Sequence, residues 1–138
     1  SNNRDTTAVV FLFPPVEDGE RWKVIPRIYI PQLTLYERVD RETTQYLDWD
    51  QAGHIITTPG ETQNYDFITD DIEMIGQIVK IECIGHDRWN SGVVVNNLKR
   101  AGYDILPYYQ NPQWMNAPMD ALENLLRAHQ VEHAGHPV

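Results

Sequence analysis

A short apolar run that is followed closely by an acid constrains this chain most. Residues 81–84 read Ile-Glu-Cys-Ile, which is typical of a buried strand, and Asp87 comes three residues after the run. In an open α/β sheet that position falls at the carboxyl edge, where ligands bind. Packing explains an acid there poorly, so Asp87 is a candidate metal ligand or acid/base group. The structural alternative is an N-cap on the following helix.

Length and charge limit the classes of function. The chain has 138 residues, which is one domain's worth, and it begins with Ser-Asn-Asn rather than Met, so we expect a fragment of a longer protein. The net charge is −9, from 20 acids and 11 bases, which argues against a nucleic-acid binder held by a broad basic face. The negative charge is compatible with an enzyme that binds phosphates through divalent cations, because the acids that hold the metal themselves make such a domain acidic.

The cysteine and the apolar runs bear on the compartment. No apolar run approaches the ~20 residues that span a bilayer, so we expect no membrane association. The sequence has one cysteine, Cys83, which excludes an internal disulfide and fits a reducing cytosol. Inside an apolar strand, Cys83 is expected to be a small core residue rather than a reactive thiol.

Periodicity and turn signals predict the order β-β-α-α-β-α-β-α-β-α-β. Strands at residues 6–13 and 21–30 are expected to form an antiparallel hairpin, with Pro26 causing an edge position, a bulge or a break. The order predicts an α/β mixed sheet with helices on both faces, in a single domain over residues 1–138. The other predicted elements are helices at 35–39, 43–52, 66–80, 91–101 and 117–129, and strands at 54–58, 81–84, 105–109 and 130–133.

Some side chains receive specific roles from this pattern. Thr34 is expected to cap the first helix, with Glu37 completing a capping box. Three acids near the start of the 66–80 helix are expected to be solvated charges that the helix dipole favours, namely Asp70, Asp71 and Glu73. The residues expected to face inward are Tyr46 and Trp49; Ile68, Ile72, Ile75 and Val79; Val94, Leu98 and Ala101; and Met119, Leu122 and Leu126.

Several stretches, each weak alone, occur together in an order and spacing that one known family shares. They are residues 1–8, 25–31, 49–53, 55–60, 65–72, 85–90 (GHDRWN) and 133–138 (HAGHPV). Residues 85–90 resemble a strand-end Asp-x-Trp-Asn motif, and residues 133–138 resemble His-x-Gly-Asn-Pro-Val with His136 in place of Asn. Together they resemble the C-terminal nuclease domain of the tailed-phage terminase large subunit, the DNA-packaging motor, in the branch of siphophages and their prophages.

The resemblance implies a ribonuclease-H-like fold, with antiparallel leading strands followed by parallel strands, and an endodeoxyribonuclease that uses two divalent ions. Two cations about 4 Å apart can stabilise the attacking and leaving oxygens, and carboxylates are natural hard ligands for them. By position, Asp87 matches the family's second acid, and Asp5 matches an acid shortly after the first, which contributes to the metal site or only shapes the loop. His86 and Arg88 are candidate substrate contacts.

The resemblance also implies cofactors, partners and a location. The cofactors would be Mg²⁺ or Mn²⁺. The partners would be double-stranded viral DNA and, through the full-length protein, the terminase small subunit and the portal, in the cytoplasm of the bacterial host. The family's first acid belongs just before Ser1 and its third lies beyond Val138, so we expect weak or no cleavage from this chain alone. The motor's phosphate-binding loop, G-x-x-x-x-G-K-[ST], does not occur in the sequence.

Alternative readings stay open at this point. His129, His133 and His136 lie close together and suggest zinc, although polar residues on an exposed terminal turn are the simpler explanation. A ribonuclease-H-like module could be catalytically silent and only contact DNA, the portal or the ATPase domain. A third reading is another ribonuclease-H-like enzyme of the transposase or resolvase type.

Overall fold

A computed structural model describes residues 5–41, 45–87 and 92–138. In these residues the strands and helices follow the predicted order, from β1 to β6 and α1 to α5. Contacts divide the chain into two compact units, which we describe separately. The Asp87 unit comprises residues 64–119, and the sheet unit comprises the described residues up to 63 together with residues 120–138.

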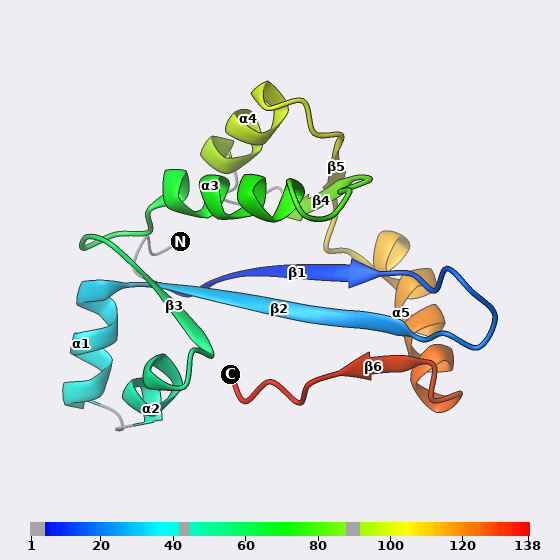
Figure 1. The fold of residues 1–138 in the computed structure, drawn as a ribbon, viewed down its shortest axis with the longest axis horizontal. Helices are drawn as coiled ribbons and strands as arrows, with labels where there is room; N and C mark the ends of the chain where they lie inside the picture. Colours follow the sequence, from blue (N-terminus) through cyan, green and yellow to red (C-terminus); the bar gives the residue numbers. More distant parts are fainter. Residues whose placement is uncertain (1–4, 42–44, 88–91) are drawn as a thin grey trace. The chain divides into compact units, whose positions relative to one another are not determined.

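The sheet unit is built around β2 (Trp22–Pro31). On one side, β1 (Thr7–Phe13) pairs with it antiparallel, which confirms the predicted hairpin. On the other side, two strands pair with it in parallel along different stretches (Figure 1). β3 (Ile55–Thr58) pairs with residues 28–31 of β2, and β6 (Val131–His133) pairs with residues 22–24. The predicted mixed sheet is therefore present.

Pro26 lies where β2 has a local edge. The pairing with β6 ends at Val24, and the pairing with β3 begins at Ile28. The N–H that proline lacks therefore removes no hydrogen bond to either neighbour. This is the expected edge position, and β2 continues through the proline as one strand.

The core of the sheet unit joins β2 and β3 to two helices, α1 (Gln32–Arg41) and α2 (Gln45–Gln51). Ile30, Leu35 and Ile55 form its buried cluster, and the partly buried Tyr46 and Trp49 pack against it. The two aromatic rings meet edge to face with centroids 5.1 Å apart, an arrangement that aromatic pairs prefer. The prediction that α2 turns these two rings inward is confirmed.

The predicted cap at Thr34 is wrong, because α1 begins at Gln32, directly after β2. Thr34 lies inside the helix and is buried, and its hydroxyl has no hydrogen-bond partner. One of the first helical N–H groups, that of Leu33, donates instead to the carbonyl of Gly60 at 3.4 Å. A contact with a distant residue therefore satisfies a backbone N–H group in the first turn of α1, where the sequence predicted a cap by a local side chain.

The Asp87 unit contains α3 (Tyr65–Gly76), β4 (Ile84–Asp87), α4 (Gly92–Arg100) and β5 (Ile105–Tyr108). It also contains the start of α5 (Pro112–Arg127), which ends in the sheet unit. The Asn64 side chain caps α3 by accepting from the N–H of Phe67 at 3.0 Å. The buried apolar residues are Ile68 and Ile72 from α3 and Val95 and Leu98 from α4, two helices in direct contact.

The strand predicted at residues 81–84 lies further along the chain, at residues 84–87. The pairing of β4 with β5 starts at Ile84, whose N–H donates to the carbonyl of Asp104 at 2.8 Å. The strand follows its pairing partner rather than the most apolar run, because ladder bonds override weak local preference. Cys83 consequently precedes the strand and is exposed, so its predicted place in the core is wrong.

Three further side-chain predictions are wrong. Asp71 is buried rather than solvated, on the same turn as the buried Ile72. Ala101 is exposed because α4 ends at Arg100, and Val95 takes the inward position beside Leu98. The apolar stripe along α5 is also exposed; its members are Met119, Leu122 and Leu126. An amphipathic pattern indicates that one face of a helix can be buried, but it does not show that another element covers that face. Within the described residues, no helix has the length and apolar character needed to cross a membrane.

Gly76, at the end of α3, makes a close approach that yields a prediction. A Cβ added there would collide with the phenol oxygen of Tyr103, at the tip of a stiff ring. Gly76→Ala is therefore expected to lower the free energy of unfolding by about 1–3 kcal/mol, the usual cost of overpacking. Urea unfolding measures this. Gly92→Ala is the control, because a Cβ there meets nothing within 4 Å, and an equal loss in both variants would contradict the account.

Glu20, in the turn between β1 and β2, gives a pH-dependent prediction. Its carboxylate accepts the N–H groups of Val16 at 2.9 Å and Glu17 at 3.4 Å, and these bonds lower the pKa of Glu20 below 4.5. The contact should hold at and above pH 4.5 and be lost as the pH falls through the lowered pKa. The amide shift of Val16 in NMR should follow this titration. Glu20→Gln should abolish the titration and Glu17→Gln should leave it unchanged; the reverse pattern would refute the assignment.

Candidate functional site

Asp87 ends β4 at the edge where β5 also ends. It is the last residue of its strand, and its register partner Tyr108 is the last residue of β5. The two strands are parallel, so their carboxyl ends lie at one edge, where open α/β sheets place their ligands. Asp87 as a residue is half-buried there. The alternative role as a helix cap is not tested, because residues 88–91, between Asp87 and the described part of α4, lie outside the described residues.

A glutamine that sequence reasoning missed contacts the Asp87 carboxylate. Nε2 of Gln110 donates to Oδ2 of Asp87 over 2.8 Å. Gln110 stands two residues after the end of β5, in the connection that leads to α5. Its position just after a strand parallel to β4 could have indicated the contact, because residues that follow parallel strands lie at the same edge of the sheet. Residue type alone gave no indication.

His86 is fixed against the main chain next to Asp87. Its Nδ1 lies 2.9 Å from the carbonyl oxygen of Asp87. A carbonyl only accepts, so Nδ1 carries the proton and donates. The half-buried ring therefore has a set orientation beside the candidate acid. Arg88, the other predicted substrate contact, lies outside the described residues.

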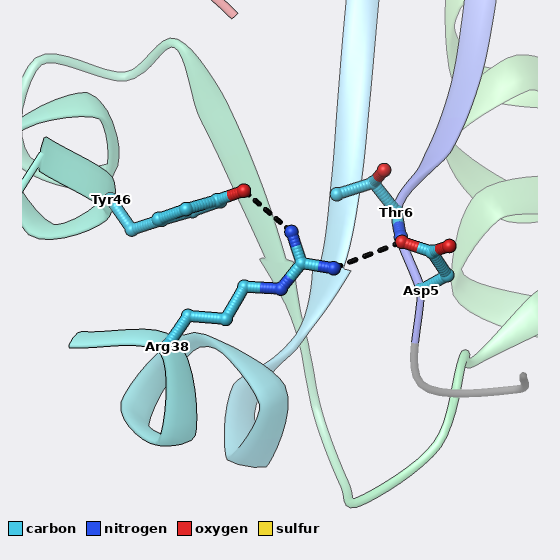
Figure 2. A network of polar contacts seen from close by, with 4 residues as sticks. All are labelled: Asp5, Thr6, Arg38 and Tyr46. Carbon is cyan, nitrogen blue, oxygen red and sulfur yellow. Dashed lines mark hydrogen bonds and ion pairs between the residues drawn. The ribbon is translucent and has the colours of Figure 1, made fainter. Parts of the chain in front are cut away.

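Asp5, in the sheet unit, is bound to a cationic side chain. Its side chain is 67% exposed, and Oδ1 accepts the N–H of Thr6 at 2.8 Å. The same oxygen accepts from Nη2 of Arg38, on α1, at 3.0 Å. Figure 2 shows the guanidinium reaching from α1 to Asp5 on one side and Tyr46 on the other. The guanidinium of Arg38 therefore already offsets the negative charge with which Asp5 would bind a metal ion.

Arg38 is in turn held by Tyr46. Nη1 of Arg38 donates to the phenol oxygen of Tyr46, and the guanidinium carbon lies 5.1 Å from the centroid of that ring. Burial lowers the pKa of Arg38, but the hydrogen bonds and charge interactions with Tyr46 and Asp5 outweigh this and hold the pKa above its usual value. Arg38 therefore stays charged and ties Asp5, two residues before β1, to both helices.

The donor chemistry fits divalent cations in part. Carboxylate oxygens are the ligands that hard cations prefer, and Asp87 presents one at a half-buried strand end. Nowhere in residues 5–41, 45–87 and 92–138 do three or more His, Cys, Asp or Glu side chains come together in a metal-binding arrangement. Asp87 and Asp5 also belong to different units. Asp87 thus qualifies as one ligand of a site that needs others.

His133 and His136 make contacts with His54 and with the backbone of the turn after β6. The rings of His54 and His136 meet edge to face with centroids 5.2 Å apart. Nδ1 of His133 accepts the N–H of Gly135 at 3.1 Å, and Nδ1 of His136 accepts that of Val138 at 3.4 Å. These contacts shape the turn after β6, and they give the zinc reading no support.

Known proteins match this chain along its whole length. Residues 1–138 match the model of the family described as terminase large subunit, endonuclease domain. The terminase large subunit of Enterobacteria phage HK97 is 32% identical over 141 residues, which cover 100% of this chain and 27% of the relative. The crystal structure of the HK97 bacteriophage large terminase has a TM-score of 0.81 at 29% identity, covering 97% of this chain and 28% of that one.

These matches confirm the resemblance and the mixed α/β fold predicted from sequence. The chain spans about a quarter of the length of the curated relative, which covers it from end to end. With a family match over all residues and a structural match at this level, the chain belongs to the endonuclease domain family of the terminase large subunit.

Proposed function

We propose that this chain is the nuclease part of a phage terminase large subunit, and that it hydrolyses phosphodiester bonds of concatemeric double-stranded DNA during packaging, with Mg²⁺ or Mn²⁺. Family membership supports the reaction class. The observation that carries the proposal is the place of Asp87, a half-buried acidic residue at the shared carboxyl edge of two parallel strands. Packing does not require an acid there.

Asp87 acts in this proposal as a hard oxygen ligand. Divalent cations at this edge would supply positive charge for the attacking and leaving oxygens of the phosphodiester. Asp87 sits on a strand rather than on a loop, which fixes its backbone. His86, oriented by its bond to the Asp87 carbonyl, lies next to the site and is a candidate substrate contact, as is Arg88.

Asp5 has two candidate roles, and its contacts favour one of them. As a metal ligand, it would have to exchange Arg38 for a cation. As a structural residue, it would hold the start of β1 against α1 through the bonds that it already makes. The ion pair favours the structural role, because a bound guanidinium opposes a second cation at the same oxygen.

The proposed partners follow from the family. DNA would meet the protein through cations and local cationic side chains, since the net charge of −9 provides no broad basic face. The terminase small subunit and the portal would be partners of the complete protein. The reading as a catalytically silent module has one observation in its favour, the lack of a three-residue acid or histidine cluster in the described part of the chain. The family match favours neither a transposase nor a resolvase.

Replacing Asp87 tests the proposed reaction. In the protein at its full natural length, Asp87→Asn should lower Mg²⁺-dependent plasmid cleavage by about 10²–10⁴-fold, because loss of a ligand charge removes several kcal/mol of transition-state stabilisation. EDTA should abolish cleavage by the unchanged protein. Asp70→Asn, at an exposed position of α3, is the matched control and should retain activity. Plasmid cleavage by the Asp87→Asn variant at the rate of the unchanged protein would contradict the proposal.

A second test separates the two roles of Asp5. If Asp5 is structural, a double-mutant cycle of Asp5→Asn and Arg38→Gln should give a coupling of about 0.2–1 kcal/mol in unfolding, the range of exposed ion pairs. Mn²⁺ affinity should then stay unchanged in Asp5→Asn. Tyr46→Phe, which keeps the ring and removes the hydroxyl, should weaken that coupling. A large loss of Mn²⁺ affinity without coupling would instead make Asp5 a ligand.

A further inference from the structure

Gln110 occupies a turn whose backbone is fixed on both sides. The N–H of Asn111 donates to the carbonyl of Tyr109 at 3.0 Å, which closes a three-residue turn with Gln110 at its centre. Before the turn, Tyr108 is paired with Asp87 in the sheet. After it, Asn111 caps α5, its side-chain oxygen accepting the N–H of Trp114 at 3.1 Å. The glutamine is thus presented by a short, ordered connection.

Three aromatic rings brace the same connection. Trp114 contacts Tyr109 with centroids 5.0 Å apart and Tyr108 with centroids 6.4 Å apart. The rings therefore tie the last residue of β5 and the residue before Gln110 to the first turn of α5. Such aromatic pairs add stabilisation beyond the area they bury. They explain why an exposed glutamine keeps one position relative to β4 and β5.

We propose that Gln110 is a positioning residue for Asp87: its amide holds the carboxylate in the orientation that binds a divalent cation. This inference rests on the proposed function of Asp87. It draws on the 2.8 Å bond from Nε2 to Oδ2 and on the turn that fixes its donor. Groups that hydrogen-bond to metal-ligating carboxylates orient them, and losing such a group typically costs about 10–100-fold in metal affinity or activity.

The neutral charge of the amide is central to this role. At Asp5, the donor is a guanidinium, which orients the carboxylate but also cancels its charge. At Asp87, the amide of Gln110 supplies a donor and adds no positive charge of its own. A fixed carboxylate that keeps its charge attracts a cation, whereas one paired with an arginine competes for it poorly. The two donors therefore differ in the charge that they bring to their carboxylates.

Two substitutions at Gln110 test the proposal through Mn²⁺ binding, measured by calorimetry on the protein at its full natural length. Gln110→Met keeps the length and removes the donor, so the Kd for Mn²⁺ should rise about 10–100-fold. Gln110→Lys keeps a donor but adds a positive charge, and it should raise the Kd at least as much. Gln113→Met and Gln113→Lys, at an exposed position in the first turn of α5, are matched controls that should leave the Kd unchanged.

A second readout needs neither metal nor activity. With selective ¹⁵N-glutamine labelling, the resonance missing from Gln110→Met identifies the side-chain amide of Gln110. In Asp87→Asn this resonance should shift, because the charged acceptor is lost, while the amide of Gln113 stays in place. An unmoved Gln110 resonance would overturn the contact itself.

The outcomes separate this inference from the proposed function. If Asp87→Asn loses Mn²⁺ binding but both Gln110 variants bind as the unchanged protein does, the positioning role is wrong and the proposed function stands. If Asp87→Asn binds Mn²⁺ normally, the proposed function fails and the inference fails with it. If Gln110→Lys binds normally while Gln110→Met does not, the donor matters and the argument from neutral charge is wrong.

Discussion

The parallel pairing of β4 with β5 is the constraint on which the candidate site depends. It runs from Ile84 opposite Ile105 to Asp87 opposite Tyr108, so both strands end at one edge. A slip of one residue would turn the Asp87 carboxylate to the other face. The same pairing places the turn after β5 next to Asp87, so that Gln110 lies within hydrogen-bond distance of the Asp87 carboxylate. The chemistry proposed at this edge is therefore a consequence of strand register.

The two candidate acids show how a partner decides what a carboxylate can do. Asp87 accepts from a neutral amide, while Asp5 accepts from an arginine that Tyr46 also holds. Both carboxylates are oriented, but the donor at Asp87 is neutral whereas the donor at Asp5 carries a positive charge. The family resemblance left Asp5 open between a metal ligand and a residue that only shapes the loop. Their contacts favour a ligand at position 87 and a structural ion pair at position 5.

The sequence predicted the order of the described elements correctly, but their local detail less well. Periodicity found every strand and helix in order, because the apolar patterns and turn residues between them agree. It misplaced β4 because Gly85 and His86 are poor strand formers, and only the pairing with β5 puts them in a strand. It missed Gln110 because an exposed polar residue in a connection acquires meaning only from a contact made across the strands.

Anomalous X-ray diffraction from crystals of the full-length protein soaked in Mn²⁺ tests the central claim most directly. If Asp87 is a cation ligand, a manganese peak should lie within about 2.5 Å of one of its carboxylate oxygens, the range of direct coordination. The amide of Gln110 should still contact the carboxylate in that structure. Manganese bound elsewhere in the domain, with no peak at Asp87, would contradict the account.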